Sequence, residues 1–246
     1  MARILQSRRK TSEAAPETLS EEEIHLRLEE TYHSIPATTC SNCGTCCEVT
    51  EEERRQGWVT MYPLYAVEYL HIAAYVDRQC APTERHFYLN FREEWPLRCP
   101  FRDEENKGCA IYPVRPLTCR TYGVLNEQRI EEAVAAYKNR KPSIQLEHFK
   151  RWERHHICPN VQVVEQDKLG VYRAHRIEFW YTKQLEILSV MVDLMGPEKK
   201  QAFEEITGIP SVLSWTWGGF NTLRFSSAEA FVPQFSAYWK KAELAR

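Results

Sequence analysis

The sequence has little glycine, no excess of charge of one sign and no long hydrophobic run. Its 246 residues include nine glycines, and 32 basic against 34 acidic residues leave a net charge of −2. With this balance, the net charge does not indicate a broad basic surface that would bind nucleic acid or an anionic membrane. The most apolar stretch, 185–195, contains Glu186, Ser189 and Asp193, so it does not resemble a membrane span of roughly 20 apolar residues. We expect no membrane contact.

Several signals of location and catalysis are also missing. The basic and then acidic residues 1–23 contain no apolar core of a signal peptide, which predicts a soluble, cytoplasmic protein. The chain has no Walker A loop, no H-E-x-x-H, no G-x-S-x-G and no G-x-G-x-x-G. Catalytic residues therefore remain unknown, and the sequence leaves open whether the protein is an enzyme.

Hydrophobic spacing predicts a mainly helical fold with little β structure. Ser20 and Glu23 form a capping box at the start of one helix. A short strand is expected at HFYLNF, residues 86–91. The periodicity and the break at Gly196-Pro197 predict helices at 21–33, 62–76, 128–139, 144–156, 174–195, 198–206 and 227–243.

Two regions cannot form long regular elements. Residues 40–53 combine small polar residues with cysteine, and residues 96–123 contain four prolines and two glycines. We expect these irregular cysteine-rich loops to be organised by metal. The chain then divides into a polar tail (1–18), a cysteine-cluster metal-binding domain (19–160) and a helical C-terminal region (161–246), which can pack as one domain with it.

The sequence is rich in cysteine. There are nine, an odd number, so complete disulfide pairing is impossible. In a reducing cytosol, clustered cysteines are more often metal ligands than disulfides. Only Cys80 lies apart from the others. The predicted metal ligands are Cys40, Cys43, Cys46, Cys47, Cys99, Cys109, Cys119 and Cys158.

The spacing of these cysteines bears on the metal. Cys46 and Cys47 are adjacent, and neighbours in an extended segment point to opposite sides, which suggests that they divide two nearby sites. The opening C-x2-C-x2-C and the pairs Cys99-Pro100 and Cys158-Pro159 are features of bacterial ferredoxin loops. We therefore favour an iron–sulfur cluster, with [4Fe–4S] as the first choice. Zinc is the alternative, because structural zinc sites with four cysteine ligands use the same C-x2-C half-site.

These motifs resemble the CxxCxxCC cysteine-cluster family, described as chelating zinc or iron and including flagellin lysine N-methylases. The resemblance rests on residues 40–47 and on the segment 98–123, RCPFRDEENKGCAIYPVRPLTCRTYG. It covers roughly residues 38–160, with Cys158 as the family's downstream cysteine. The C-terminal third, including Trp215, Trp217 and Gly218-Gly219, lies outside it.

Residues other than cysteine have predicted roles near the cluster. Arg98, Arg115 and Arg120 are candidates to offset the negative charge of the thiolates or to donate hydrogen bonds to sulfur, and surface contacts are the alternative. Tyr112 and Tyr122 are expected in the core. His155 and His156 are reserve ligands in case one cysteine is not used.

Three function classes follow. The first, which we favour, is a structural or electron-carrying iron–sulfur protein. The second, implied by the resemblance, is a protein lysine N-methylase-like enzyme. The third is a zinc-organised protein-binding module that docks through its aromatic C-terminal segment, although Trp215 and Trp217 are more often core. The partner or protein substrate is unknown.

Overall fold

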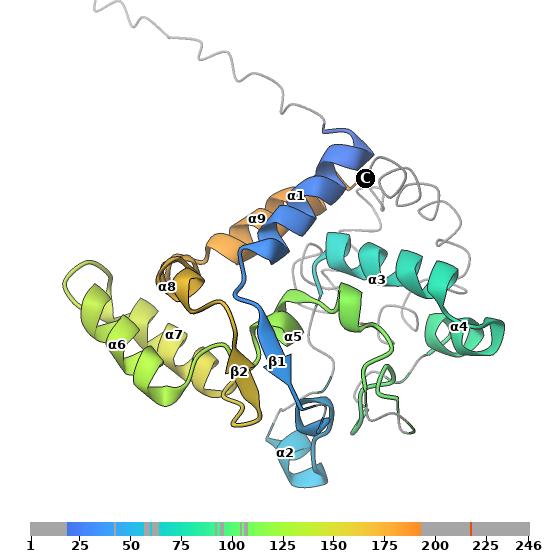
Figure 1. Ribbon diagram of the computed structural model, residues 1–246, viewed down its shortest axis with the longest axis horizontal. Coiled ribbons are helices and arrows are strands. Elements are labelled where there is room, and N and C mark those ends of the chain that lie inside the picture. Colours follow the sequence, from blue (N-terminus) through green and yellow to red (C-terminus); the bar gives the residue numbers. More distant parts are fainter. Residues whose placement is uncertain are drawn as a thin grey trace, which may run out of the picture.

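The computed structural model describes residues 19–41, 43–56, 60, 64–91, 93, 96–103, 105, 108–192 and 217. As predicted, this part of the chain is mainly helical with little β structure (Figure 1). In chain order the helices and strands are α1 (Glu21–His33), β1 (Thr38–Cys40), the 3-10 helix η1 (Thr45–Cys47), α2 (Glu51–Arg55), α3 (Ala66–Gln79), α4 (Pro82–Leu89), η2 (Tyr112–Val114), α5 (Leu117–Thr121), α6 (Glu127–Tyr137), α7 (Ser143–Arg154), β2 (Val161–Val163), η3 (Gln166–Lys168), α8 (Leu169–Ile177) and α9 (Trp180–Met191).

Local capping explains why α1 begins where the sequence predicts. The Ser20 hydroxyl accepts the Glu23 N–H at 3.2 Å, and the Glu23 carboxylate accepts the Ser20 N–H at 2.7 Å. Two otherwise unpaired backbone donors are thereby satisfied, which fixes the first turn. Ile24 and Leu28, four residues apart, are buried on one face of the helix.

Helix α3 contributes many residues to the buried core. Most of its 14 residues are buried, including Val67, Leu70 and Ala74 at helical spacing. It contacts α4 and α9, and α9 also packs against α1, so these helices lie side by side in Figure 1. Among the described helices, none is long and apolar enough to cross a membrane.

A second layer consists of α6 and α7, which pack against each other and join the rest through α8 (Figure 1). Asn126 caps α6 by accepting the Arg129 N–H at 2.9 Å. Ile130 on α6 and Phe149 on α7 are buried. The sequence predicted both helices to within about two residues.

The described strands, β1 and β2, form an antiparallel pair. Thr38 lies opposite Val163, and Cys40 lies opposite Val161. Gly123, with φ +74°, passes so close that a Cβ there would meet Val161 at 2.5 Å. The pairing brings the chain just after Cys158 next to the first cysteine loop.

Two predicted elements differ in the structure. Residues 86–91, predicted as a strand, belong largely to α4, which begins at Pro82 and is capped where Glu84 accepts the Ala81 N–H at 2.9 Å. The predicted helix 174–195 is interrupted at Phe179, whose φ of 55° ends α8 and begins α9. The helices predicted at 198–206 and 227–243, the Gly196-Pro197 break and Trp215 lie outside the described residues.

Candidate metal centre

The first cysteine loop is a tight turn rather than an extended segment. Gly44 has φ +76°, and the Cys47 N–H donates to the Gly44 carbonyl at 2.8 Å, which closes the 3-10 helix η1. The sulfurs of Cys46 and Cys47 are consequently 3.8 Å apart. The expectation that these neighbours point to opposite sides is wrong, because it assumed an extended backbone.

Backbone pairing places the second cysteine region against this turn. The Cys99 N–H donates to the Cys47 carbonyl at 2.8 Å, and the Val49 N–H donates to the Leu97 carbonyl at 2.8 Å. One turn further along, the Ala110 N–H donates to the Phe101 carbonyl at 2.8 Å, which folds Cys109 back towards Cys99. Two irregular segments distant in sequence are thus held together by their own backbones.

Six of the eight predicted ligands line one cavity of about 110 Å³. Its other walls include apolar side chains of which Phe101, Ile111 and Trp217 are buried. Among the cysteines of this lining, the residues Cys46 and Cys119 are exposed and the others are half-buried. The lining cysteines are Cys40, Cys46, Cys47, Cys99, Cys109 and Cys119.

Cys43 and Cys158 lie beside this cavity rather than on its lining. The Cys43 sulfur is 3.3 Å from the Thr45 hydroxyl and accepts a hydrogen bond from the Asn160 amide at 3.4 Å. These hydrogen bonds, Thr45 first, lower the pKa of Cys43 to about 7. Burial, and then the neighbouring Cys43, raise the pKa of Cys158.

The cavity cysteines oppose one another's ionisation. Burial, and then Cys109 and Cys46, raise the pKa of Cys119 to about 12, because many protein atoms surround its sulfur even though the residue keeps an exposed surface. Burial likewise raises the pKa of Cys99 and of Cys109. The chain alone therefore disfavours several thiolates here. A bound cation would remove that penalty and release protons as it binds.

Of the three predicted arginines, Arg115 alone lines the cavity. Its guanidinium lies 4.1 Å from the Tyr112 ring centroid, and its charge acts to lower the pKa of both Cys109 and Cys119 against the effect of burial. Arg98 instead pairs with Glu48 at 2.9 Å. Arg120 donates to the carbonyls of Arg115 and Pro113 at 2.7 and 2.6 Å and so braces the loop before α5.

The arrangement is a convergent set of thiols held by irregular loops, and the comparison with protein families agrees with it. A family model named CxxCxxCC, described as "putative zinc- or iron-chelating domain", matches residues 39–161. The chain belongs to the CxxCxxCC family. The matched range contains all nine cysteines, so the match alone does not separate Cys80 from the others. Neither the curated proteins nor the solved structures gave a match to this chain.

Cys80 lies apart from the cavity of this CxxCxxCC domain. It follows α3, its N–H donates to the Val76 carbonyl at 3.2 Å, and it packs against the apolar core. It does not line the cavity. Its role as the spare thiol stays a prediction.

The sequence also singled out two tyrosines, a histidine and a tryptophan, and the structure shows where each of them lies. Tyr112 and Tyr122 line the cavity, but Tyr112 is 38% exposed, so the expectation that it lies in the core is wrong. It covers the Arg115 guanidinium instead of filling space between helices. His156 is buried, and its Nδ1 lies 2.8 Å from the Trp152 carbonyl. Trp217, expected in the core, is fully buried between Tyr69 and Phe101.

Sequence reasoning missed Arg102, which fixes the cysteine turn. Its Nη1 donates to the Gly44 carbonyl at 3.0 Å, and the same guanidinium pairs with Glu48. A Cβ on Gly44 would lie 2.2 Å from this Nη1. Glycine is therefore required at this position for two reasons: it adopts the positive φ without strain, and its lack of a Cβ leaves room for the arginine.

Glu68 was also missed, although it positions the helix that carries Cys119. Its buried carboxylate accepts the Leu117 N–H at 2.6 Å, the Tyr32 hydroxyl at 2.9 Å and the Tyr65 N–H at 3.2 Å. One side chain of α3 thus ties the start of α5 to α1. A glutamate inside an apolar helix such as α3 was the available signal, because a buried carboxylate requires partners.

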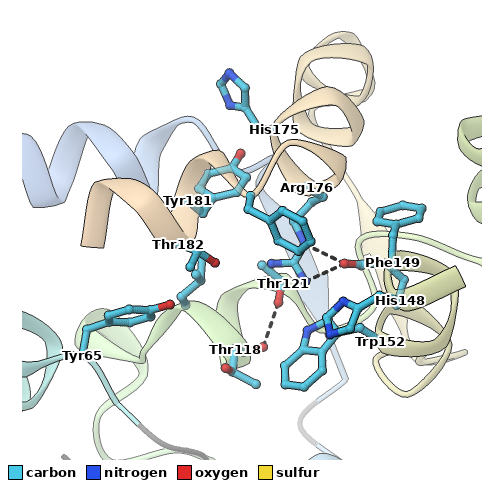
Figure 2. Close-up of a pocket in the computed structure, with 13 residues that line it drawn as sticks. Tyr65, Thr118, Thr121, His148, Phe149, Trp152, His175, Arg176, Tyr181 and Thr182 are labelled. Atoms are coloured by element: carbon cyan, nitrogen blue, oxygen red, sulfur yellow. Dashed lines mark hydrogen bonds and ion pairs between the residues drawn. The ribbon is translucent and has the colours of Figure 1, made fainter. Parts of the chain in front are cut away.

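A second cavity, of about 400 Å³, lies between α5, α7, α8 and α9. Figure 2 shows rings of Tyr65, Trp152, His148 and Tyr181 around it. Its charged groups neutralise each other, because the Arg176 Nε donates to the Glu153 carboxylate at 2.6 Å. The ion pair of Arg176 and Glu153 therefore adds no net charge to a lining that is otherwise rich in aromatic rings.

Proposed function

We propose that the cysteine cavity holds an iron–sulfur cluster, with [4Fe–4S] as the favoured form. The supporting observation is a set of four thiols that line one cavity: Cys46, Cys99, Cys109 and Cys119. Within this set Cys46 acts to raise the pKa of each of the other three. Four thiolates are the usual ligand set of such a cluster. These four come from both cysteine-rich regions, so a bound cluster would cross-link the two.

Sulfur spacing favours a cluster over a single zinc ion. Thiolates around tetrahedral zinc lie about 3.8 Å apart, given a Zn–S bond of about 2.3 Å. Cys46 and Cys47 meet that spacing, but no three cysteine sulfurs of the described residues lie within 4.8 Å of one another. A cluster of several irons bridges more widely separated sulfurs than one ion can.

The walls of the cavity suit a charged cluster. Phe101, Ile111 and Trp217 limit solvent on one side, and Arg115 supplies positive charge near Cys109 and Cys119. Burial, charge and hydrogen bonds to sulfur are the means by which a protein adjusts a cluster's reduction potential. The role we propose is structural or electron-carrying, in a reducing cytosol.

A second ligand set lies beside the first. Cys43, Cys46 and Cys40 all lie close enough to Cys158 to raise its pKa in addition to burial, and β1–β2 pairing holds this corner together. We propose that Cys40, Cys43 and Cys158, completed by Cys47, form a second site, which adjoins the first because Cys40 and Cys47 also line the cavity. Fully loaded protein would then contain two centres. A metal content per chain that accounts for only one centre would contradict the second site.

The optical spectrum of full-length protein purified without oxygen tests the proposal. Brown protein with a broad sulfur-to-iron absorption that bleaches on reduction supports a redox-active cluster, whereas absorption that resists reduction supports a structural one. Colourless, folded protein loaded with zinc would refute the proposal and support the zinc alternative. Cys119→Ser should lose the absorption, and Cys80→Ser, the matched control, should retain it.

A further inference from the structure

Three metal-ligating side chains meet between α1 and α3, away from the cysteine cavity. His25 and Glu29 are four residues apart on α1, hence on one face of the helix. His71 projects from α3 towards them, with its ring centroid 5.6 Å from that of His25. One ligand atom from each of the three lies within 4.8 Å of the other two.

Both imidazoles are buried, at 4% and 6% exposure for His25 and His71, while Glu29 is partly exposed. Leu28 of α1 and Val67 of α3 belong to the apolar core. Polar side chains buried among apolar ones cost free energy unless they have polar partners or a metal. The histidines are therefore not explained by apolar packing alone.

We propose that His25, Glu29 and His71 form a second kind of metal site, which binds a divalent transition-metal ion such as zinc or iron(II). Two imidazoles and one carboxylate are a recurrent ligand set for these ions. Ligand atoms around a four-coordinate zinc ion lie about 3.4 Å apart, given bonds of about 2.1 Å. His71 Nε2 and Glu29 Oε1 are already 3.6 Å apart, so closure needs only small side-chain shifts.

An opening leads to this site. Glu29 also lines a pocket of about 310 Å³ together with Tyr32, Arg115, Arg120 and Lys168. The pocket gives the ion a route from solvent and leaves room for a fourth ligand. Because Arg115, Arg120 and Lys168 outnumber the carboxylates Glu29 and Glu165 on its lining, that ligand would be water or a small anion. This set is distinct from the cysteine centre, since it contains no sulfur and two of its residues precede the matched range 39–161.

Zinc binding by the full-length protein tests the proposal. Wild type, Glu29→Gln and His71→Gln are dialysed against Zn²⁺, and zinc, iron and sulfide are counted per chain. Both variants should hold one zinc fewer than wild type while keeping the same iron and sulfide. His86→Gln, at an exposed histidine on α4 away from this site, is the matched control and should bind as wild type does.

A thermal measurement covers the case in which a histidine variant does not fold. Glu29→Gln preserves the size of the side chain and keeps it polar, and its fold is checked by circular dichroism. Added Zn²⁺ should raise the melting temperature of wild type and of His86→Gln more than that of Glu29→Gln, because binding to the folded state stabilises it. Equal zinc content and equal shifts in all variants would overturn the site. Failure of the cysteine cluster to hold iron would leave this test unaffected.

Discussion

Substitution of Gly44 by alanine should destabilise the cysteine turn. Gly44 has φ +76°, a conformation that costs a residue with a Cβ about 1–2 kcal/mol. The new Cβ would lie 2.2 Å from Arg102 Nη1, so the guanidinium must move and lose its 3.0 Å hydrogen bond to the Gly44 carbonyl. Because the Arg102 side chain is only 12% exposed, that loss adds about 1–2 kcal/mol.

Together these effects predict a decrease of about 2–4 kcal/mol in the free energy of unfolding of metal-loaded Gly44→Ala protein. Urea unfolding measures the decrease, and metal analysis should show reduced occupancy. Gly170→Ala is the matched control, because no atom lies within 4 Å of its added Cβ and the residue lies in α8. It should stabilise the protein by up to about 1 kcal/mol. A Gly44→Ala protein as stable and as fully loaded as wild type would refute the reasoning.

Four further substitutions test other features of the structure. Cys80→Ser should leave the metal-to-protein ratio unchanged, whereas Cys119→Ser should lower it. Glu68→Gln should lower the free energy of unfolding by about 1–3 kcal/mol, because an amide cannot accept all the hydrogen bonds that the buried carboxylate now accepts, including the one from Leu117. Trp217→Ala should cost about 3–5 kcal/mol in urea unfolding, because the indole is fully buried and its removal leaves a cavity.

Specific outcomes would contradict these predictions. Loss of metal in Cys80→Ser would place that thiol in a site. Wild-type unfolding of Glu68→Gln would show that the carboxylate does not hold α5 in place. Trp152, on α7 and 41% exposed, is the control for Trp217, and equal destabilisation by both alanine variants would argue against a buried indole.

Elements governed by local interactions were predictable from the sequence. The capping box of Ser20 and Glu23 lies within one turn, and the start of α1 follows from it. The prolines and glycines of 96–123 limit regular structure to short pieces such as α5. The cysteine spacing likewise identified the thiols that line the cavity.

Features that depend on distant contacts were not predictable. Residues 86–91 are rich in aromatic side chains, as many strands are, but Tyr88 and Leu89 are buried as part of α4, which packs on α3. Arg102 and Gly44 are 58 residues apart, and Glu68 and Leu117 are 49 apart. No local pattern joins such pairs, so the residues that hold the cysteine loops in place emerged only from the structure.

Iron and acid-labile sulfide, counted per chain in full-length protein purified without oxygen, test the central claim most directly. We expect equal amounts of iron and sulfide, about four of each for every cluster bound, and the loss of both in Cys119→Ser. Folded protein that contains zinc at the cysteines, with neither iron nor sulfide, would contradict it.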